Sequence, residues 1–270
     1  MNANGYRAFF GLQAEPFPTD LALEHILETP DLLALNERFQ FAVSIGAIAL
    51  VTGEVGAGKS TALRWASSQL HPAQYRVLWM TASSGSILEL YRQLLAELDI
   101  DTASCSRAIL TRTIRGQITE LVRAKKLQPV LIIDEASLLR LDVFAELHTI
   151  TQFQADSKPW LPIILAGQNN LADHLLYRTA GPLASRIVAR SHLHAVDRET
   201  MTDYLQHHLQ VAGLPNSPFQ DSAVTAIYQG SGGLFRKANH LARGALIAAA
   251  GQQSLSVDAE HVRLAASELF

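Results

Sequence analysis

The sequence predicts an α/β protein in which helices cover both faces of a parallel sheet, followed by a small helical domain. Short, continuously apolar runs that are typical of buried parallel strands alternate with helical patterns over about the first 195 residues. After about residue 196 the strand signals stop, and only helical patterns follow. With 270 residues, the chain has room for one large domain and a small one.

Five segments carry the strand signal, and the last of them is the weakest. Helical patterns separate the strands, for example at 60–70 and 86–98, where apolar residues recur at helical spacing. Four more helices are expected at 198–213, 221–233, 235–251 and 256–270, with polar or glycine breaks between them. The predicted strands are 47–53 (AIALVTG), 76–82 (RVLWMTA), 129–136 (PVLIIDEA), 162–167 (PIILAG) and 189–195 (ARSHLHA).

Composition excludes several classes of protein. A net charge of −3 argues against a wholly basic nucleic-acid binder but leaves room for a local basic patch. The single cysteine, Cys105, excludes an internal disulfide and fits a reducing compartment. No apolar run approaches the roughly 18 residues of a membrane span, and the N-terminus lacks the pattern of a signal peptide. These features predict a cytoplasmic protein without a membrane segment.

The strongest motif is GEVGAGKS at 53–60, which follows the first predicted strand and opens a helix. It fits the phosphate-binding loop pattern, in which glycines let backbone N–H groups and the helix N-terminus face phosphate oxygens. Lys59 is expected to reach the β- and γ-phosphates, and the Ser60 hydroxyl is a hard oxygen ligand for Mg²⁺. The predicted nucleotide-binding residues here are Gly53, Glu54, Val55, Gly56, Ala57, Gly58, Lys59, Ser60 and Thr61.

The second motif is VLIIDEA at 130–136, where a buried strand ends in two carboxylates. Ligands of open parallel sheets bind at the carboxyl ends of the strands. Asp134 is therefore predicted to hold Mg²⁺ together with Ser60. Glu135, one residue further, is predicted to polarise the attacking water, because phosphoryl transfer depends mainly on positioning and charge.

Together with PIILAGQNNL, GPLASRI and GGLFRKANHL, these motifs resemble the AAA+ ATPases of the group that includes general secretion pathway protein A and the ATPase subunits of transposons. The resemblance spans nearly the whole chain, including the lead-in YRAFFGLQAEPF. It implies a P-loop AAA+ fold with a helical lid, Mg²⁺-dependent ATP hydrolysis, and assembly into a ring or filament. The implied segments are an N-terminal lead-in packed on the core (1–40), the ATPase domain (41–195) and the lid (196–270).

The same resemblance assigns three further residues. Gln168 falls at the sensor-1 position after the fourth strand, although Asn169 is an alternative. Arg186 matches the arginine finger that acts on the ATP of a neighbouring subunit, with Arg178 as a rival and Arg190 as a weaker one. Arg236 resembles the sensor-2 arginine of the lid, which reaches bound nucleotide, and Gly232 and Gly233 would let the lid backbone approach it.

A charge pattern suggests a second partner. In a helix over 106–126, Arg112, Arg115, Arg123 and Lys126 fall on one side, opposite Leu110, Ile114, Ile118 and Leu121. A basic stripe of this kind could contact the DNA backbone, although an ordinary solvated face explains it as well. The preferred function is an ATPase that assembles with ATP on double-stranded DNA and assists a transposase. The alternative is an ATPase of a secretion assembly complex, which the sequence favours less because it ends at Phe270 without a membrane helix or a peptidoglycan-binding domain.

Overall fold

The structure is a computed structural model that describes residues 5–267. The chain divides into two compact units, each described by itself below. An α/β unit contains residues 30–53 and 59–193. A helical unit contains residues 5–29, 54–58 and 194–267 of the described chain. Residues 1–4 and 268–270 of the expected lead-in and lid lie outside the described residues.

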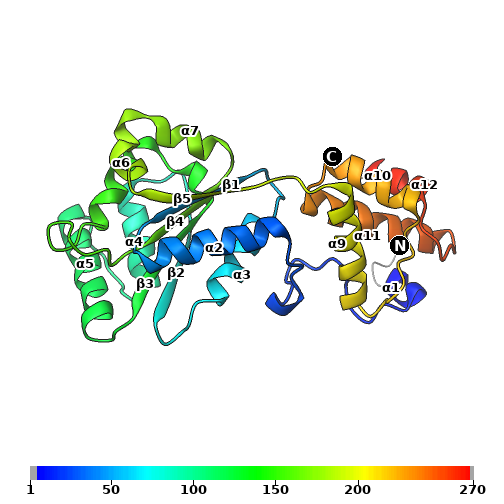
Figure 1. The fold of residues 1–270 in the computed structure, drawn as a ribbon, viewed down its shortest axis with the longest axis horizontal. Helices are drawn as coiled ribbons and strands as arrows, with labels where there is room; N and C mark the ends of the chain where they lie inside the picture. Colours follow the sequence, from blue (N-terminus) through cyan, green and yellow to red (C-terminus); the bar gives the residue numbers. More distant parts are fainter. Residues whose placement is uncertain (1–4, 268–270) are drawn as a thin grey trace. The chain divides into compact units, whose positions relative to one another are not determined.

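The α/β unit is built on a five-stranded parallel sheet (Figure 1), which confirms the predicted fold class. The strand order is β2-β3-β4-β1-β5, so β1 lies between β4 and the edge strand β5. All five strands form where the apolar runs predict them. Their bounds are β1 Ile48–Gly53, β2 Tyr75–Thr81, β3 Gln128–Asp134, β4 Ile163–Gly167 and β5 Ile187–Leu193.

Helices connect the strands of this unit. The longer ones carry an apolar face toward the sheet, and short 3-10 turns follow β3 and α7. The helical elements are α2 Pro30–Ser44, α3 Lys59–Ser68, α4 Ile87–Glu97, α5 Arg107–Arg123, η2 Ala136–Leu138, α6 Leu141–Ile150, α7 Asn170–Leu176, η3 Arg178–Ala180 and α8 Gly181–Ala184.

The central strands β1, β3 and β4 are buried on both faces, which explains why their sequences are continuously apolar, whereas the edge strands β2 and β5 are partly exposed. In the strand register, Ile163 of β4 lies between Ile48 of β1 and Leu131 of β3. These three side chains therefore lie on the same face of the sheet. That face packs in one core with the buried residues of α4, α5 and α6. Helices α2 and α3 also contact the sheet, and the alternate strand residues, such as Val51 and Ile132, are buried too. The sheet is therefore covered from both sides.

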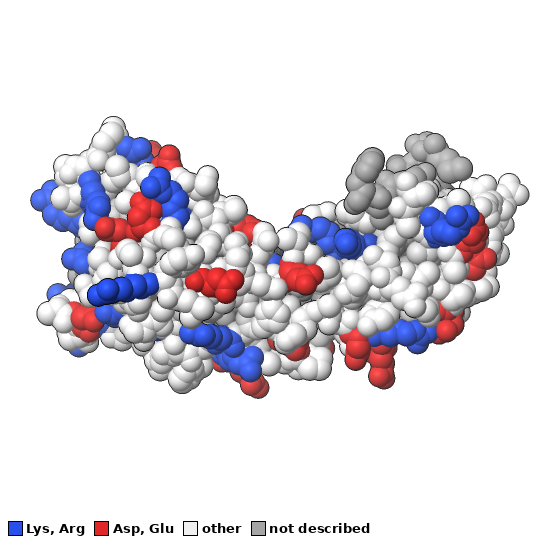
Figure 2. Space-filling model, turned by 90° about the horizontal axis from the view of Figure 1, so that it is seen from above, with Lys and Arg blue, Asp and Glu red and all other residues white. Residues whose placement is uncertain are grey.

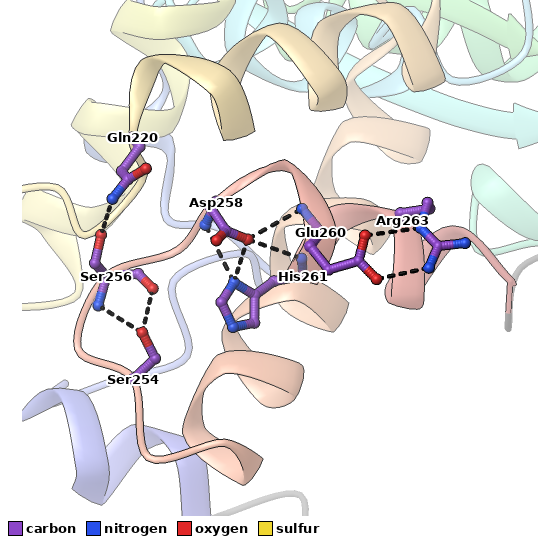
Figure 3. Close-up of polar contacts among 7 residues, drawn as sticks. All are labelled: Gln220, Ser254, Ser256, Asp258, Glu260, His261 and Arg263. Atoms are coloured by element: carbon purple, nitrogen blue, oxygen red, sulfur yellow. Dashed lines mark hydrogen bonds and ion pairs between the residues drawn. The ribbon is translucent and has the colours of Figure 1, made fainter.

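The helical unit is formed mainly by four helices, as the sequence predicts: α9 Arg198–Val211, α10 Asp221–Ser231, α11 Phe235–Gly251 and α12 Ala259–Ser267. Asp258 caps α12, because its Oδ1 accepts from the backbone N–H groups of Glu260 (3.0 Å) and His261 (3.2 Å). The His261 ring returns the contact, its Nδ1 accepting from the Asp258 N–H at 3.2 Å (Figure 3). This reciprocal pair fixes the start of the last helix.

Part of the lead-in belongs to the core of the helical unit. The short helix α1, Gly5–Phe10, and the turn η1, Leu23–His25, lie in this segment. Tyr6, Phe10 and Phe17 are buried in one cluster with residues of α9 to α12. The following helix α2 instead belongs to the α/β unit. The segment therefore divides at Pro30, because its aromatic side chains find apolar partners on the C-terminal helices.

A polar network fastens this segment to α11. Glu15 accepts hydrogen bonds from the Tyr6 hydroxyl and from Arg243 Nε (2.8 Å), and Arg243 also donates to the Phe17 carbonyl. Burial alone would raise the pKa of Glu15, but the bonds from Tyr6 and Arg243 outweigh it and hold that pKa below its usual value. Burial raises the pKa of Tyr6, and the hydrogen bond to the negatively charged Glu15 raises it further. The network thus pairs a negative carboxylate with two donors.

The helical unit should lose stability as the pH falls from about 6.5 toward 4, because His208 is buried against this segment. Its Nδ1 donates to the Pro16 carbonyl at 2.9 Å, and the Tyr204, Phe17 and His207 rings surround it. Burial lowers the pKa of His208 from 6.5 to about 4. Within that window the unfolded histidine binds a proton that the folded one does not, so the free energy of unfolding should fall by about 3 kcal/mol.

Urea unfolding measured across this pH range checks the expectation. His208→Asn keeps an amide donor close to the position of Nδ1 and cannot titrate, so most of the decline should disappear. If the variant and the wild-type protein lost equal stability toward pH 4, His208 would not be its source.

None of the helices within residues 5–267 combines the length and the apolar character that crossing a membrane requires.

Candidate functional site

The carboxyl edge of the sheet brings most of the predicted site residues of the α/β unit together. Thr52, which precedes Gly53, lies beside Gly167 in the register of β1 and β4. Asp134 is the last residue of β3 and lies beside Thr81 of β2. Because the strands are parallel, the residues that follow them leave the sheet at one edge.

The GEVGAGKS loop has the backbone that its glycines predict. Gly56 and Gly58 have φ angles of +90° and +93°, which glycine adopts at little cost. The loop ends where α3 begins at Lys59, whose side chain is buried with a relative exposure of 7%. Lys59 Nζ donates to the Gly53 carbonyl at 2.9 Å, so the ammonium group is held across the loop. A buried cation beside a glycine-rich turn provides the positive charge that a phosphate needs.

Ser60 and Asp134 meet directly. The Ser60 hydroxyl donates to Asp134 Oδ2 at 2.6 Å, while Oδ1 of the same carboxylate accepts from the Glu135 N–H at 2.8 Å. Asp134 is buried, whereas Ser60 is exposed. Hydroxyl and carboxylate oxygens are the ligands that Mg²⁺ prefers in nucleotide sites. The oxygen atoms of Ser60 and Asp134 are therefore suitable ligands for a magnesium ion.

Glu135 has an unusual backbone. Its φ and ψ of 52° and 31° lie in the left-handed region, which is costly for a residue with a Cβ. Residues held in such conformations cluster at functional sites, because the surrounding structure must enforce them. Here the Glu135 carbonyl accepts from the Leu138 N–H at 2.9 Å, which closes the turn η2. The half-buried Glu135 side chain thus begins a fixed turn rather than a continuing strand.

Gln168 and Asn169 both follow β4 and are exposed. The Gln168 N–H donates to the buried Ser137 hydroxyl at 3.4 Å. A Cβ added to Gly167 would lie 2.8 Å from the Ser137 backbone nitrogen, so the turn after β3 and the end of β4 are in close contact. No motif in the sequence points to Ser137 or Gly167 as parts of the site. A glycine at a strand end was the only signal, and it does not name its partner.

Arg186, the predicted finger, forms an ion pair with Asp156 that no sequence pattern indicates. It precedes β5 and forms a bidentate ion pair with the Asp156 carboxylate, with Nη1–Oδ1 and Nη2–Oδ2 distances of 3.0 and 2.6 Å. The rival arginines, Arg178 in η3 and Arg190 on β5, are exposed. Asp156 lies 30 residues from Arg186 along the chain, and no local pattern links the two.

Arg236 lies in the helical unit, which also contains loop residues 54–58. The Arg236 N–H donates to the Gly56 carbonyl at 3.3 Å, and a Cβ on Gly56 would lie 2.9 Å from the Arg236 Cβ. The Arg236 side chain is exposed. The predicted sensor residue and the phosphate-binding loop are thus in backbone contact within one unit.

The two glycines before Arg236 have structural roles within the helical unit. Gly232 takes a left-handed conformation, with φ of 62°, as the cap that ends α10. A Cβ on Gly233 would lie 2.3 Å from the Val196 carbonyl, and the Val196 N–H donates to the Gly233 carbonyl at 3.0 Å. Gly232 therefore ends a helix and Gly233 packs against Val196, while their expected role in letting the lid backbone approach a nucleotide stays a prediction.

The basic stripe on α5 also differs from the expectation. Its apolar face is buried as predicted, but the helix ends at Arg123, so Lys126 lies beyond it. Arg115 Nη2 donates to the Thr149 carbonyl at 2.5 Å, and Arg123 lies over the Trp160 ring, 5.1 Å from its centre. Two of the four cations thus bind within the α/β unit. On the face shown in Figure 2, basic and acidic side chains are interspersed.

Residues 45–175 match the family model described as AAA domain. Over 98% of its length the chain is 30% identical to general secretion pathway protein A from Aeromonas hydrophila. It covers 48% of that relative, so it spans about half of its length.

Solved structures with similar folds have lower sequence identity. The chain aligns over 98% of its length with 71% of Cdc6p from Pyrobaculum aerophilum, at 16% identity and a TM-score of 0.71. It aligns over 92% of its length with 67% of ORC1 from Aeropyrum pernix, at 16% identity and a TM-score of 0.69. For RuvB from Thermotoga maritima the figures are 95% and 74%, 17% identity and 0.58. These likenesses concern the fold.

Proposed function

We propose that this chain is an AAA+ ATPase that hydrolyses ATP with Mg²⁺ at the carboxyl edge of its sheet, in an assembly of several copies. The observation that carries this proposal is the 2.6 Å contact between the Ser60 hydroxyl and Asp134 Oδ2. Two hard oxygens meet there beside the buried Lys59, and each belongs to one of the two nucleotide-binding motifs. The proposal treats residues 41–195 as the ATPase domain and 196–270 as its lid.

In this proposal each residue at the edge has a role in positioning or charge. The N–H groups of residues 53–61 and the Lys59 ammonium bind the phosphates, and Ser60 and Asp134 hold the metal ion. When bound, Mg²⁺ would neutralise phosphate charge that develops during transfer. Lys59 exchanges its bond with the Gly53 carbonyl for one with a phosphate oxygen, because an anion competes better for an ammonium group.

Glu135 and Gln168 act on the attacking water. Glu135 follows Asp134 directly, and its fixed left-handed turn sets where its carboxylate begins. In the proposed step Glu135 accepts a proton from water as the water oxygen attacks the γ-phosphorus, the bond from that phosphorus to the β–γ bridging oxygen breaks, and ADP leaves with this oxygen. The Gln168 amide can donate to that water or to a phosphate oxygen. The contact of Gly167 with the Ser137 backbone supports joint placement of the two residues.

Two arginines complete the proposed machinery. Arg186 acts on the ATP of a neighbouring copy, where its planar guanidinium stabilises charge on the transferred group. Arg236 senses the nucleotide of its own chain, which the backbone contact between Arg236 and Gly56 supports.

For the biological pathway, we favour an ATPase of the secretion-assembly type. The 30% identity to general secretion pathway protein A over 98% of the chain supports this choice. The sequence alone favoured the transposition role because it ends at Phe270. The end of the given sequence is not evidence for either role, so the identity to the secretion protein decides the order. The cytoplasm is the proposed location, because ATP is available there.

A DNA-bound ATPase that assists a transposase is the second candidate. Residues 106–126 hold six basic residues and one acidic residue in a chain of net negative charge, which favours this candidate. The exposed Arg112 and Lys126 are the members of the stripe left for contacts with double-stranded DNA. Assembly would repeat them along one surface, so weak contacts could add.

A salt titration of duplex binding separates the two candidates. With a non-hydrolysable ATP analogue, the DNA-bound ATPase should bind duplex at low salt, and binding should weaken steeply as salt rises. Arg112→Glu should lower both the affinity and the salt slope, whereas Arg38→Glu, the same change at an exposed arginine of α2, should matter less. If duplex binding did not depend on nucleotide, the DNA-bound candidate would be excluded. If Arg112→Glu and Arg38→Glu lowered binding equally, α5 would not be the DNA-binding surface.

A further inference from the structure

The Asp156 carboxylate binds the Arg186 guanidinium, which the proposed function needs at the ATP of a neighbouring copy. Both terminal nitrogens of the guanidinium bind the carboxylate, at 3.0 and 2.6 Å. The side chains have relative exposures of 29% and 42%, so a competing anion can reach them. The same two nitrogens form the fork with which arginine grips phosphate.

Asp156 is held in place by an unusual turn. Gln154, Ala155 and Asp156 have φ angles of 48°, 54° and 67°, and none of them is a glycine. Left-handed conformations cost residues with a Cβ roughly 1–2 kcal/mol each, so surrounding contacts must enforce the turn. Phe153 and Lys158 form a β-bridge across it, and the buried Phe153 ring packs on Trp160.

The carboxylate is charged at neutral pH. Its hydrogen bonds from Arg186 hold the pKa of Asp156 below the usual value. An anion that is to bind Arg186 must therefore displace a charged partner. The γ-phosphate of ATP brings several charged oxygens at once, and ADP lacks that group.

We propose that Asp156 masks Arg186 in the single subunit, and that Arg186 leaves it only for the γ-phosphate of ATP bound to a neighbouring copy. This inference rests on the proposed role of Arg186 between subunits. Under it, Asp156 sets the protein concentration at which ATP drives assembly. It also makes assembly depend on the third phosphate, because ADP cannot compete for the guanidinium.

The test is specific ATPase activity and sedimentation measured against protein concentration for Asp156→Asn. This variant keeps the shape of the side chain and removes its charge. Exposed ion pairs contribute little, so we expect half-maximal activity and assembly at about two- to fivefold lower concentration. The kcat at saturating protein should not change, and ADP should support assembly better than it does in wild type.

Matched variants separate the possible outcomes. Asp99→Asn removes a comparable ion pair, Arg76–Asp99 at 2.7 Å, and should leave the concentration dependence unchanged. In the Arg186→Ala background, Asp156→Asn should have no effect on assembly. Full hydrolysis by Arg186→Ala alone would reject the finger and the masking together.

If Arg186→Ala is inactive and Asp156→Asn behaves like wild type, the masking is wrong and the finger stands. A lower kcat at saturating protein for Asp156→Asn, without a shift in concentration dependence, would show that Asp156 supports the guanidinium instead. That result would overturn the inference as well.

Discussion

Replacing Glu135 with glutamine should leave ATP binding intact and reduce hydrolysis by about 10²–10⁴-fold, the usual contribution of a general base. The amide keeps the size of the side chain but cannot accept the proton of the attacking water. Ser60 and Asp134, which meet at 2.6 Å, are untouched, so the metal ion and phosphates should bind as before. Binding of a fluorescent ATP analogue and steady-state phosphate release measure the two properties separately.

Lys59→Ala provides the contrast, because it should remove tight nucleotide binding itself. Its ammonium is the buried charge beside the phosphate loop, and alanine supplies neither charge nor donor. Asp142→Asn, a carboxylate-to-amide change at an exposed site on α6, is the control that should alter neither property. Glu135→Gln and Lys59→Ala losing binding to the same extent would show that Glu135 supports the structure and is not the base.

Arg186→Ala should bind ATP and lose hydrolysis by about 10³–10⁵-fold, the range known for arginine fingers. Mixing it with Lys59→Ala protein should restore part of the activity. In a mixed interface, the intact phosphate loop of one subunit can meet the intact Arg186 of the other. ATPase assays over a series of mixing ratios measure this recovery.

Arg236→Ala is the matched control for that experiment. If Arg236 senses its own nucleotide, this variant should also lose hydrolysis but recover little when mixed with Lys59→Ala. Each intact phosphate loop would then belong to a chain that lacks its own sensor. No recovery in either mixture would leave the finger without support, and specific activity that does not depend on protein concentration would argue against it directly.

The fold could be predicted because its signals are local. Buried strands such as Val130–Ile133 are continuously apolar, since helices cover both faces of the sheet. The phosphate loop follows a strand and opens a helix, and its glycines have the positive φ that such a loop requires. The contact of Ser60 with Asp134 follows from both motifs leaving the same edge of a parallel sheet.

Contacts between distant segments could not be predicted. Helical spacing gave the side of α5 on which Arg115 and Arg123 lie, but not that the Thr149 carbonyl and the Trp160 ring are within their reach. The partner of Arg186 is in a left-handed turn without glycine, which no turn rule indicates. The contact of Gly233 with Val196 is likewise one that the sequence does not show.

The aromatic residues near the start of the chain make the α/β unit an insertion within the helical unit. Tyr6, Phe10 and Phe17 are synthesised before the α/β unit, but the core that buries them needs helices that are synthesised after it. During translation these side chains stay without their partners while the whole α/β unit is synthesised and can fold. A fragment ending after β5 would keep the aromatic residues without their partners, and one starting at α9 would keep the partners without the aromatic residues. We therefore expect the core of the helical unit to form after the α/β unit has been synthesised, and to need both of its parts.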